Sequence, residues 1–332
     1  MTNDNENIVN EEEELQNTPT TDDSKVTVVG EEEIDFIPPS VKLPISTTTS
    51  IHYSEIPEMI LNSPQEPIIL GVDEAGRGPV LGPMVYGISY CPKSYSETLK
   101  KKYGFADSKT LNESKRTQLM TQLCDSSNEL FKFVGWACTI MTARDISSGM
   151  LKPRHVGNYN LNEQAHDTTM DLIDGILKKG INLKEVYVDT VGPPTTYQEK
   201  LKKRFPSLSI TVTKKADSLF PIVSTASIVA KVTRDYNLYH SSKGVDWGSG
   251  YPGDPRTVKW LNSKVDPVFG WDNNVRFSWQ TAKDSLIKNK ALEMCWDDDL
   301  PLEDDKIDYG NIASMIGGDT KVVDCSWFIT GQ

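Results

Sequence analysis

Three short apolar segments, each leading into an acidic residue, limit the possible fold more than any other feature of the sequence. Segments of this length that are rich in isoleucine and valine are typical of strands buried on both faces of a sheet. The segments and their acids are Ile68–Val72 before Asp73 and Glu74, Val186–Val188 before Asp189, and Ile210–Val212 shortly before Asp217.

The spacing of apolar residues elsewhere predicts a mixed α/β sheet covered by helices. The first three strands follow one another as an antiparallel meander, and the later strands alternate with helices, which favours parallel neighbours. The expected strands are residues 68–72, 84–90, 131–140, 186–188 and 209–213. The expected helices are residues 112–124, 160–178, 197–205, 218–238, 256–263 and 277–290.

Charge is distributed unevenly along the 332 residues, whose formal net charge is −12. Residues 1–40 carry −11 and residues 291–332 carry −8, which leaves +7 on the middle of the chain and makes phosphate binding by that part feasible. We expect an acidic disordered tail over residues 1–62, an α/β domain over 63–245, a helical C-terminal extension of the same unit over 246–296, and an acidic tail over 297–332.

The sequence contains neither a long apolar run nor the basic and apolar regions of a signal peptide. We therefore expect an intracellular protein that does not contact membranes. The five cysteines are widely spaced and form no Cys-x-x-Cys pair, which favours buried reduced thiols over a disulfide or zinc framework.

The acids that follow the strands are expected to meet, because the ends of parallel strands lie at one edge of a sheet. Gathered carboxylates repel one another unless multivalent cations share them, and oxygen ligands prefer Mg²⁺ or Mn²⁺ over zinc. Such a site predicts hydrolysis of phosphodiesters by two metal ions. Taken one at a time, the acids have a structural explanation too: strand-end turns for Asp73, Glu74 and Asp189, and a helix N-cap for Asp217.

The turn Gly76-Arg77-Gly78-Pro79 follows the first acid pair directly. Its glycines permit positive φ and close approach of a ligand to main-chain amides, although a plain hairpin turn would use them as well. The spacing fits neither a phosphate-binding loop, which ends in Lys-Ser/Thr, nor the dinucleotide fingerprint.

Seven motifs in order resemble those of the type 2 ribonucleases H, and the eukaryotic catalytic subunits of that family most of all. The resemblance covers roughly residues 66–296. The motifs are Gly71–Pro79, Asp107–Leu111, Tyr159–Asn162, Tyr187–Gly192, Lys215–Asp217, Ala226–Lys231 and Gly248–Pro252.

The resemblance implies a ribonuclease H-like fold for residues 63–245, with a five-stranded mixed sheet flanked by helices and a helical C-terminal extension. The family's four catalytic, metal-binding acids correspond to Asp73, Glu74, Asp189 and Asp217. The resemblance further implies substrate-binding roles for backbone groups of Gly76, Arg77 and Gly78 at the ribose 2′-hydroxyl, for Tyr251 at the sugar, and for Lys109 and Asn162 at phosphates.

The implied reaction is hydrolysis on the 5′ side of a ribonucleotide, which leaves a 5′-phosphate, in RNA–DNA hybrids and in duplex DNA with embedded ribonucleotides. Family members of this kind remove ribonucleotides from DNA and RNA primers during replication, in the nucleus, as heterotrimers with accessory B and C subunits. The C-terminal region helps to dock these partners. Candidate contacts, for which core burial is an equal explanation, are Trp271, Phe277, Trp279 and Trp296.

Two other classes of protein would share part of this pattern. A DNA nuclease or integrase with the same fold would have the acids but no need of the glycine turn or Tyr251. A non-catalytic scaffold tends to lose one or more acids, and all four are present here.

Overall fold

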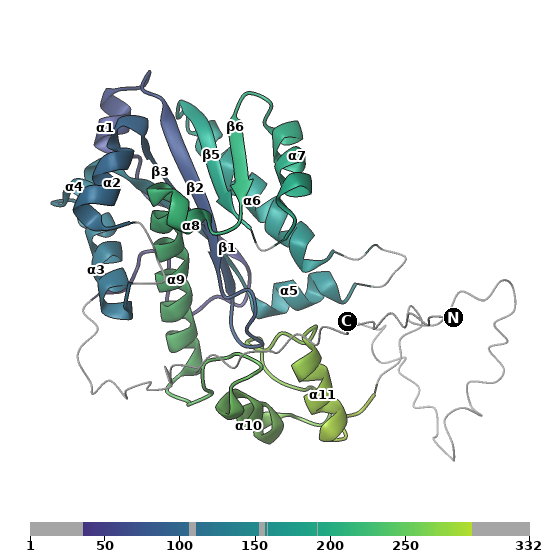
Figure 1. Ribbon diagram of the computed structural model, residues 1–332. Helices are drawn as coiled ribbons and strands as arrows, with labels where there is room; N and C mark the ends of the chain where they lie inside the picture. The colour runs from purple at the N-terminus through teal and green to yellow at the C-terminus, as the bar shows by residue number, and fades with distance from the viewer. Residues whose placement is uncertain (1–35, 106–110, 153–156, 158, 191, 294–332) are drawn as a thin grey trace, which may run out of the picture. The chain divides into compact units, whose positions relative to one another are not determined.

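A mixed sheet forms the centre of the computed structural model, which describes residues 36–105, 111–152, 157, 159–190 and 192–293. The strand order is β1-β4-β3-β2-β5-β6. The parallel pairs are β2–β5 and β5–β6, which lie side by side in Figure 1. The strands are β1 (Ser50–Tyr53), β2 (Ile68–Ala75), β3 (Met84–Pro92), β4 (Gly135–Met141), β5 (Leu183–Asp189) and β6 (Ser209–Thr213). The expected mixed α/β sheet is confirmed.

The sixth strand, β1, corrects two expectations, a five-stranded sheet and disorder up to residue 62. It pairs antiparallel with β4, with Ser50 opposite Ile140 and Tyr53 opposite Ala137. Tyr53 packs against the main core, and helix α1 (Glu58–Asn62) follows. A strand of four residues is stabilised by its neighbour rather than by its own apolar pattern, so no periodicity in the sequence indicates it. Residues 1–35 of the expected tail, and all of 297–332, lie outside the described part of the chain.

Helices cover both sides of the sheet. The expected ones are present with shifted ends, and helices at 58–62, 96–103, 129–133 and 143–150 were not expected. Residues 131–133 belong to a helix that Asn128 caps, and not to the following strand. The helix expected at 218–238 is two, because Pro221, which has no N–H to donate, begins a new one. After α1, the helices are α2 (Ser96–Tyr103), α3 (Glu113–Cys124), α4 (Glu129–Phe133), α5 (Ala143–Met150), α6 (Leu161–Lys178), α7 (Pro194–Arg204), α8 (Ala216–Leu219), α9 (Pro221–Ser242), α10 (Pro255–Lys264) and α11 (Gln280–Lys288), with a 3₁₀ turn at Lys93–Tyr95.

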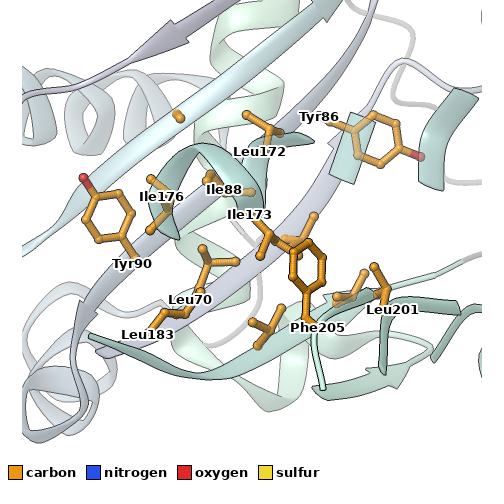
Figure 2. Packing of buried hydrophobic residues seen from close by; sticks show 14 of the residues in the cluster. Leu70, Tyr86, Ile88, Tyr90, Leu172, Ile173, Ile176, Leu183, Leu201 and Phe205 are labelled. Atoms are coloured by element: carbon orange, nitrogen blue, oxygen red, sulfur yellow. The ribbon is translucent and has the colours of Figure 1, made fainter. Parts of the chain in front are cut away.

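Alternate residues of β2 face the two layers of helices. Leu70 and Val72 enter the main apolar core, which side chains of α6 and α7 complete (Figure 2). On the other face, Gly71 lies against α9, where a Cβ would come within 2.5 Å of backbone atoms of Ile222 and Val223. The same alternation turns the two acids at the end of β2 toward different faces, Asp73 toward α9 and Glu74 toward α6 and α7.

The C-terminal extension has a small core of its own, which confirms the expected helical extension. Trp247, Leu261 and Val275 pack there against Val80 and Leu81 of the loop after β2. Trp271, Phe277 and Trp279 also pack against this core and are partly buried, whereas Trp296 lies outside the described residues.

Two further observations concern the described residues. Cys91, Cys124 and Cys138 are free thiols, of which Cys91 and Cys138 are buried and Cys124 is partly buried. None of the described helices combines the length and apolar character needed to span a bilayer.

Candidate active site

The carboxyl ends of β2 and β5 bring Asp73 and Asp189 onto neighbouring strands. Val72 is the parallel partner of Val188, and the two aspartates are the next residues of their strands. Asp73 also remains paired with Gly87 of β3, so it belongs to the sheet and not to a turn.

Asp217 reaches the same edge by a different local route. Asp189 is the partner of Thr213 at the end of β6, and the chain then turns through Lys215, whose φ is 59°. Asp217 follows in the first turn of α8 and is 3% exposed. The residues that cap α8 and α9 are Lys215 and Phe220, so the N-cap explanation of Asp217 is wrong.

Asp189 is held in place by main-chain donors. Its Oδ1 accepts hydrogen bonds from the amides of Thr190 at 2.9 Å and Ala216 at 3.1 Å. Burial raises the pKa of Asp189, as does the charge of Asp217, while the Ala216 amide opposes the shift. These contacts join the end of β5 to the start of α8.

Burial and mutual repulsion disfavour the charged forms of the two acids of β2. Burial raises the pKa of Asp73 to about 7 and Asp189 adds to the shift, against a hydrogen bond from Ser227 and the charge of Lys231. Burial also raises the pKa of Glu74 to about 8, with a contribution from Asp73 and with Arg77 opposing. The positive charges nearby therefore do not balance this group of carboxylates.

A divalent cation would supply the missing charge, and the oxygen donors suit Mg²⁺ or Mn²⁺. Among the described residues, no three acidic, histidine or cysteine side chains form a ready ligand set for one ion. Asp73 and Glu74, on opposite faces of β2, do not point toward a single ion. Mg²⁺ is commonly held by only one or two carboxylates together with water and substrate phosphates, so neighbouring pairs such as Asp73 and Asp189 fit it.

The turn that follows these acids packs against the loop containing Tyr251. Gly76 has a φ of +76°, and a Cβ there would lie 2.7 Å from the carbonyl oxygen of Pro83. The amide of Val80 donates to the carbonyl of Gly250 at 2.8 Å. The ring of Tyr251 lies 3.5 Å from the position of a Cβ on Gly78 and is 48% exposed. The structure thus brings together the expected turn and the expected tyrosine.

A cavity of about 210 Å³ adjoins the acids on the α6 side of the sheet. Glu74 and Asp189 line it together with Arg77, whose guanidinium donates a hydrogen bond to Asn162. Asn162 therefore holds the Arg77 side chain at the start of α6. His166 lines the same cavity, and burial lowers its pKa to about 4, with Lys200 contributing.

Several residues near the acids were not among those selected from the sequence. His166 stacks on Tyr197 with ring centroids 3.8 Å apart, and Ser227 of α9 hydrogen-bonds Asp73. Arg276, fully buried, contacts the glycine turn from the extension. No periodicity marks these positions, because each matters through a partner distant in sequence. Lys109 lies outside the described residues.

A second depression, about 640 Å³ in volume, lies on α10 and α11 and contains none of the acids. It is shallow and open, and Lys259 and Lys288 are its charged residues. Because Glu74 and Asp189 line it, the smaller cavity is the candidate active site.

Comparison with known proteins gives consistent similarities. The family model for ribonuclease HII matches residues 70–282, a span that includes the four acids, the turn and Tyr251. The A subunit of ribonuclease H2 from Schizosaccharomyces pombe is 49% identical over 301 residues, which cover 88% of this chain and 90% of that protein. The corresponding protein of Bos taurus is 47% identical over 252 residues, 74% of this chain and 80% of that one. The crystal structure of ribonuclease H2 from Pyrococcus horikoshii superimposes with a TM-score of 0.57 at 29% identity, covering 67% of this chain and 99% of that one.

Proposed function

Because this chain belongs to the ribonuclease HII family, we propose that it is an endoribonuclease. It hydrolyses the RNA strand of RNA–DNA hybrids, and it nicks duplex DNA on the 5′ side of embedded ribonucleotides. The observation that supports this most is the adjacency of two features. Buried, mutually repelling carboxylates at the ends of β2 and β5 lie beside a glycine turn that packs on Tyr251.

The carboxylates would bind the metal ions. Asp73, Glu74, Asp189 and Asp217 would hold Mg²⁺ or Mn²⁺, and two such ions would supply activation of water and stabilisation of charge on the leaving oxygen. The amides of Thr190 and Ala216 fix the Asp189 carboxylate at the end of β5. The products would be a 3′-hydroxyl on the upstream fragment and a 5′-phosphate on the ribonucleotide.

Substrate recognition would use the turn, the tyrosine and α6. A ribose 2′-hydroxyl is the one group that distinguishes RNA from DNA at a single position, and main-chain amides of the turn can bond to it. Tyr251 supplies an exposed ring on which the sugar can pack. Asn162, by holding Arg77, keeps that guanidinium beside Glu74 and close to an incoming phosphate. Lys109 remains a further expected phosphate contact.

The relatives are named as one lettered subunit of ribonuclease H2, and we extend that organisation to this chain by proposing a heterotrimer with accessory B and C subunits. We also propose a nuclear location and roles in removing ribonucleotides from DNA and RNA primers during replication. Purifying the chain with and without co-expressed partners and assaying both preparations on a hybrid and on a single-ribonucleotide duplex tests the need for them. Equal activity of both preparations would argue against an obligate trimer.

The catalytic proposal is tested by nicking of a labelled duplex that contains one ribonucleotide, with an all-DNA duplex of the same sequence beside it. We expect Mg²⁺-dependent nicking of the first duplex only, and its loss in Asp73→Asn. Asp284→Asn, on the exposed face of α11, is the matched control and should retain activity. Nicking by Asp73→Asn would disprove the assignment of the acids, and equal cutting of the all-DNA duplex would indicate a DNA nuclease instead.

A further inference from the structure

A buried arginine from the C-terminal extension holds the carbonyl side of the glycine turn. The Arg276 side chain is fully buried, and its guanidinium donates three hydrogen bonds. Nη2 donates to the carbonyl of Gly76 at 2.6 Å, Nη1 to that of Arg77 at 3.0 Å, and Nε to that of Gly82 at 3.0 Å. All three acceptors precede Arg276 by about 200 residues, so a distant segment determines how these peptide groups are oriented.

A tryptophan completes this contact. The indole Nε1 of Trp279 donates to the carbonyl of Gly78 at 3.0 Å, and the Arg276 guanidinium lies over the same indole ring at 4.8 Å. Each of the three carbonyls from Gly76 to Gly78 thus has a donor on the extension. We call Arg276 and Trp279 together the carbonyl clamp.

The chemistry of Arg276 is costly for a purely structural contact. Burial lowers its pKa to about 9, and the nearby Arg234 adds to the shift, so the group is still charged at neutral pH. None of the three hydrogen bonds described above reaches a carboxylate. A buried ion without an opposite charge loses several kcal/mol of hydration, and apolar packing would join the extension to the turn more stably. A planar guanidinium, however, is suited to holding several oxygens at fixed angles.

Because of the geometry of the peptide bond, a residue that holds a carbonyl also fixes the direction of the N–H group in the same peptide. The carbonyl of one residue and the N–H of the next point in opposite directions across a trans peptide. With the carbonyls of Gly76 and Arg77 held by Arg276, the amides of Arg77 and Gly78 point away from the clamp. Trp279 holds the next peptide, Gly78–Pro79, which carries no N–H, so it acts on the Gly78 amide by fixing the backbone of Gly78 from its other side. Neither amide donates a hydrogen bond to another described residue, and Pro79, which follows, has no N–H. The clamp therefore leaves two adjacent donors, and Gly78, which carries one of them, lies against the ring of Tyr251.

We propose that Arg276 and Trp279 are positioning residues, which orient the amides of Arg77 and Gly78 toward the ribose 2′-hydroxyl and thereby make the C-terminal extension a determinant of the preference for RNA over DNA. The inference rests on the proposed function, and adds to it the part of the chain that sets the selectivity.

The test compares two tryptophans with equivalent hydrogen bonds. Trp279→Phe removes the donor to Gly78 and leaves a ring for Arg276, whereas Trp271→Phe removes an indole donor to the carbonyl of Leu261, within the extension, at 2.9 Å. Dissociation constants of each protein are measured in Ca²⁺ for a single-ribonucleotide duplex and for the all-DNA duplex, and kcat and KM for nicking are measured in Mg²⁺. Thermal melting and hydrogen exchange over residues 76–82 monitor the fold and the turn.

Trp279→Phe should reduce the preference for the ribonucleotide duplex about tenfold, the equivalent of one hydrogen bond, with all-DNA binding unchanged. Trp271→Phe should melt at a similar temperature to Trp279→Phe and keep the wild-type preference. Arg276→Lys retains the charge but cannot reach three carbonyls from one ammonium, so it should lose about a hundredfold in kcat/KM and exchange faster at the turn.

The outcomes separate this inference from the proposed function. If the wild type nicks at ribonucleotides and Trp279→Phe exchanges faster at the turn with its preference intact, the clamp is structural only and the inference is wrong. Wild-type kcat/KM and wild-type preference in Arg276→Lys would also contradict the inference, because a positive charge at this position would then be enough to orient the amides. If the wild type shows no preference for the ribonucleotide duplex, the proposed function itself fails.

Discussion

Replacing Asp73 with asparagine should make the metal-free protein more stable while abolishing its activity. The carboxylate of Asp73 is 6% exposed and shares its surroundings with Asp189 and Glu74, so its charged form is disfavoured in the fold. An amide removes that charge and keeps an oxygen to accept the hydrogen bond that the Glu74 amide donates at 2.8 Å. Stability and function are then opposed at a single residue.

The size of the effect follows from the shift in pKa. The pKa of Asp73 is raised from 3.8 to about 7, and at roughly 1.4 kcal/mol for each pH unit this corresponds to about 4 kcal/mol. The variant also gives up the hydrogen bond of Ser227 to a charged acceptor and the attraction to Lys231, so we expect about half of that gain, roughly 2 kcal/mol. For a chain of this size the melting temperature should rise by about 4–8 °C at about pH 8.

The dependence on pH distinguishes this cause from better packing. A group whose pKa is raised by folding contributes its full stability below its unfolded pKa and loses it as the pH rises through its folded pKa. The difference in melting temperature between Asp73→Asn and wild type should therefore be smallest near pH 3.8 and grow until about pH 7. Melting curves in EDTA across this range measure it, with Asp284→Asn as the control. A gap that is constant with pH, or a variant less stable than wild type at about pH 8, would refute the reasoning. Added Mg²⁺ should raise the melting temperature of the wild type but not of Asp73→Asn.

Three further outcomes are expected. Gly71→Ala should destabilise the fold by about 3 kcal/mol in denaturant unfolding, because its Cβ would meet the α9 backbone at 2.5 Å, whereas Gly253→Ala, with nothing within 4 Å, should change it by less than about 0.5 kcal/mol. His166→Phe keeps the stack on Tyr197 and removes a group whose pKa is lowered from 6.5 to about 4. Relative to that variant, the wild type should lose melting temperature as the pH falls from 6.5 toward 4. Melting temperatures that change in parallel with pH in the two proteins would contradict this. Chelation of divalent cations should abolish nicking, and Mg²⁺ or Mn²⁺ should restore it; activity that persists in EDTA would exclude a metal-dependent reaction.

The strand-end acids could be predicted because a general rule of sheets acts on them. Parallel strands end at one edge, so the positions of Asp73 and Asp189 followed once β2 and β5 were recognised from their apolar residues. The opposite orientation of Glu74 follows from the same alternation, although the acids were expected to form one cluster. Asp217 was expected near the edge as well, but its place in a separate short helix depended on Pro221.

The parts that sequence could not predict depend on partners far along the chain. β1 exists because β4 offers an edge, and nothing in the composition of residues 50–53 reveals that pairing. Arg276 binds carbonyl oxygens, which every residue possesses, so no residue type at positions 76–82 could indicate it. The apolar pattern predicts elements, but contacts between side chains and a distant backbone leave no trace in it.

The order in which the chain is synthesised gives the contact between Arg276 and the turn another consequence. All four acids have been added once the ribosome reaches Asp217, yet Arg276 follows about 60 residues later, roughly 3–12 s at about 5–20 residues per second. During that interval, and permanently in any product truncated before Arg276, the carboxylates are present while the turn lacks the donors that hold it. A shortened product of this kind would be expected to lose the selection of ribonucleotides even where its four acids are in place.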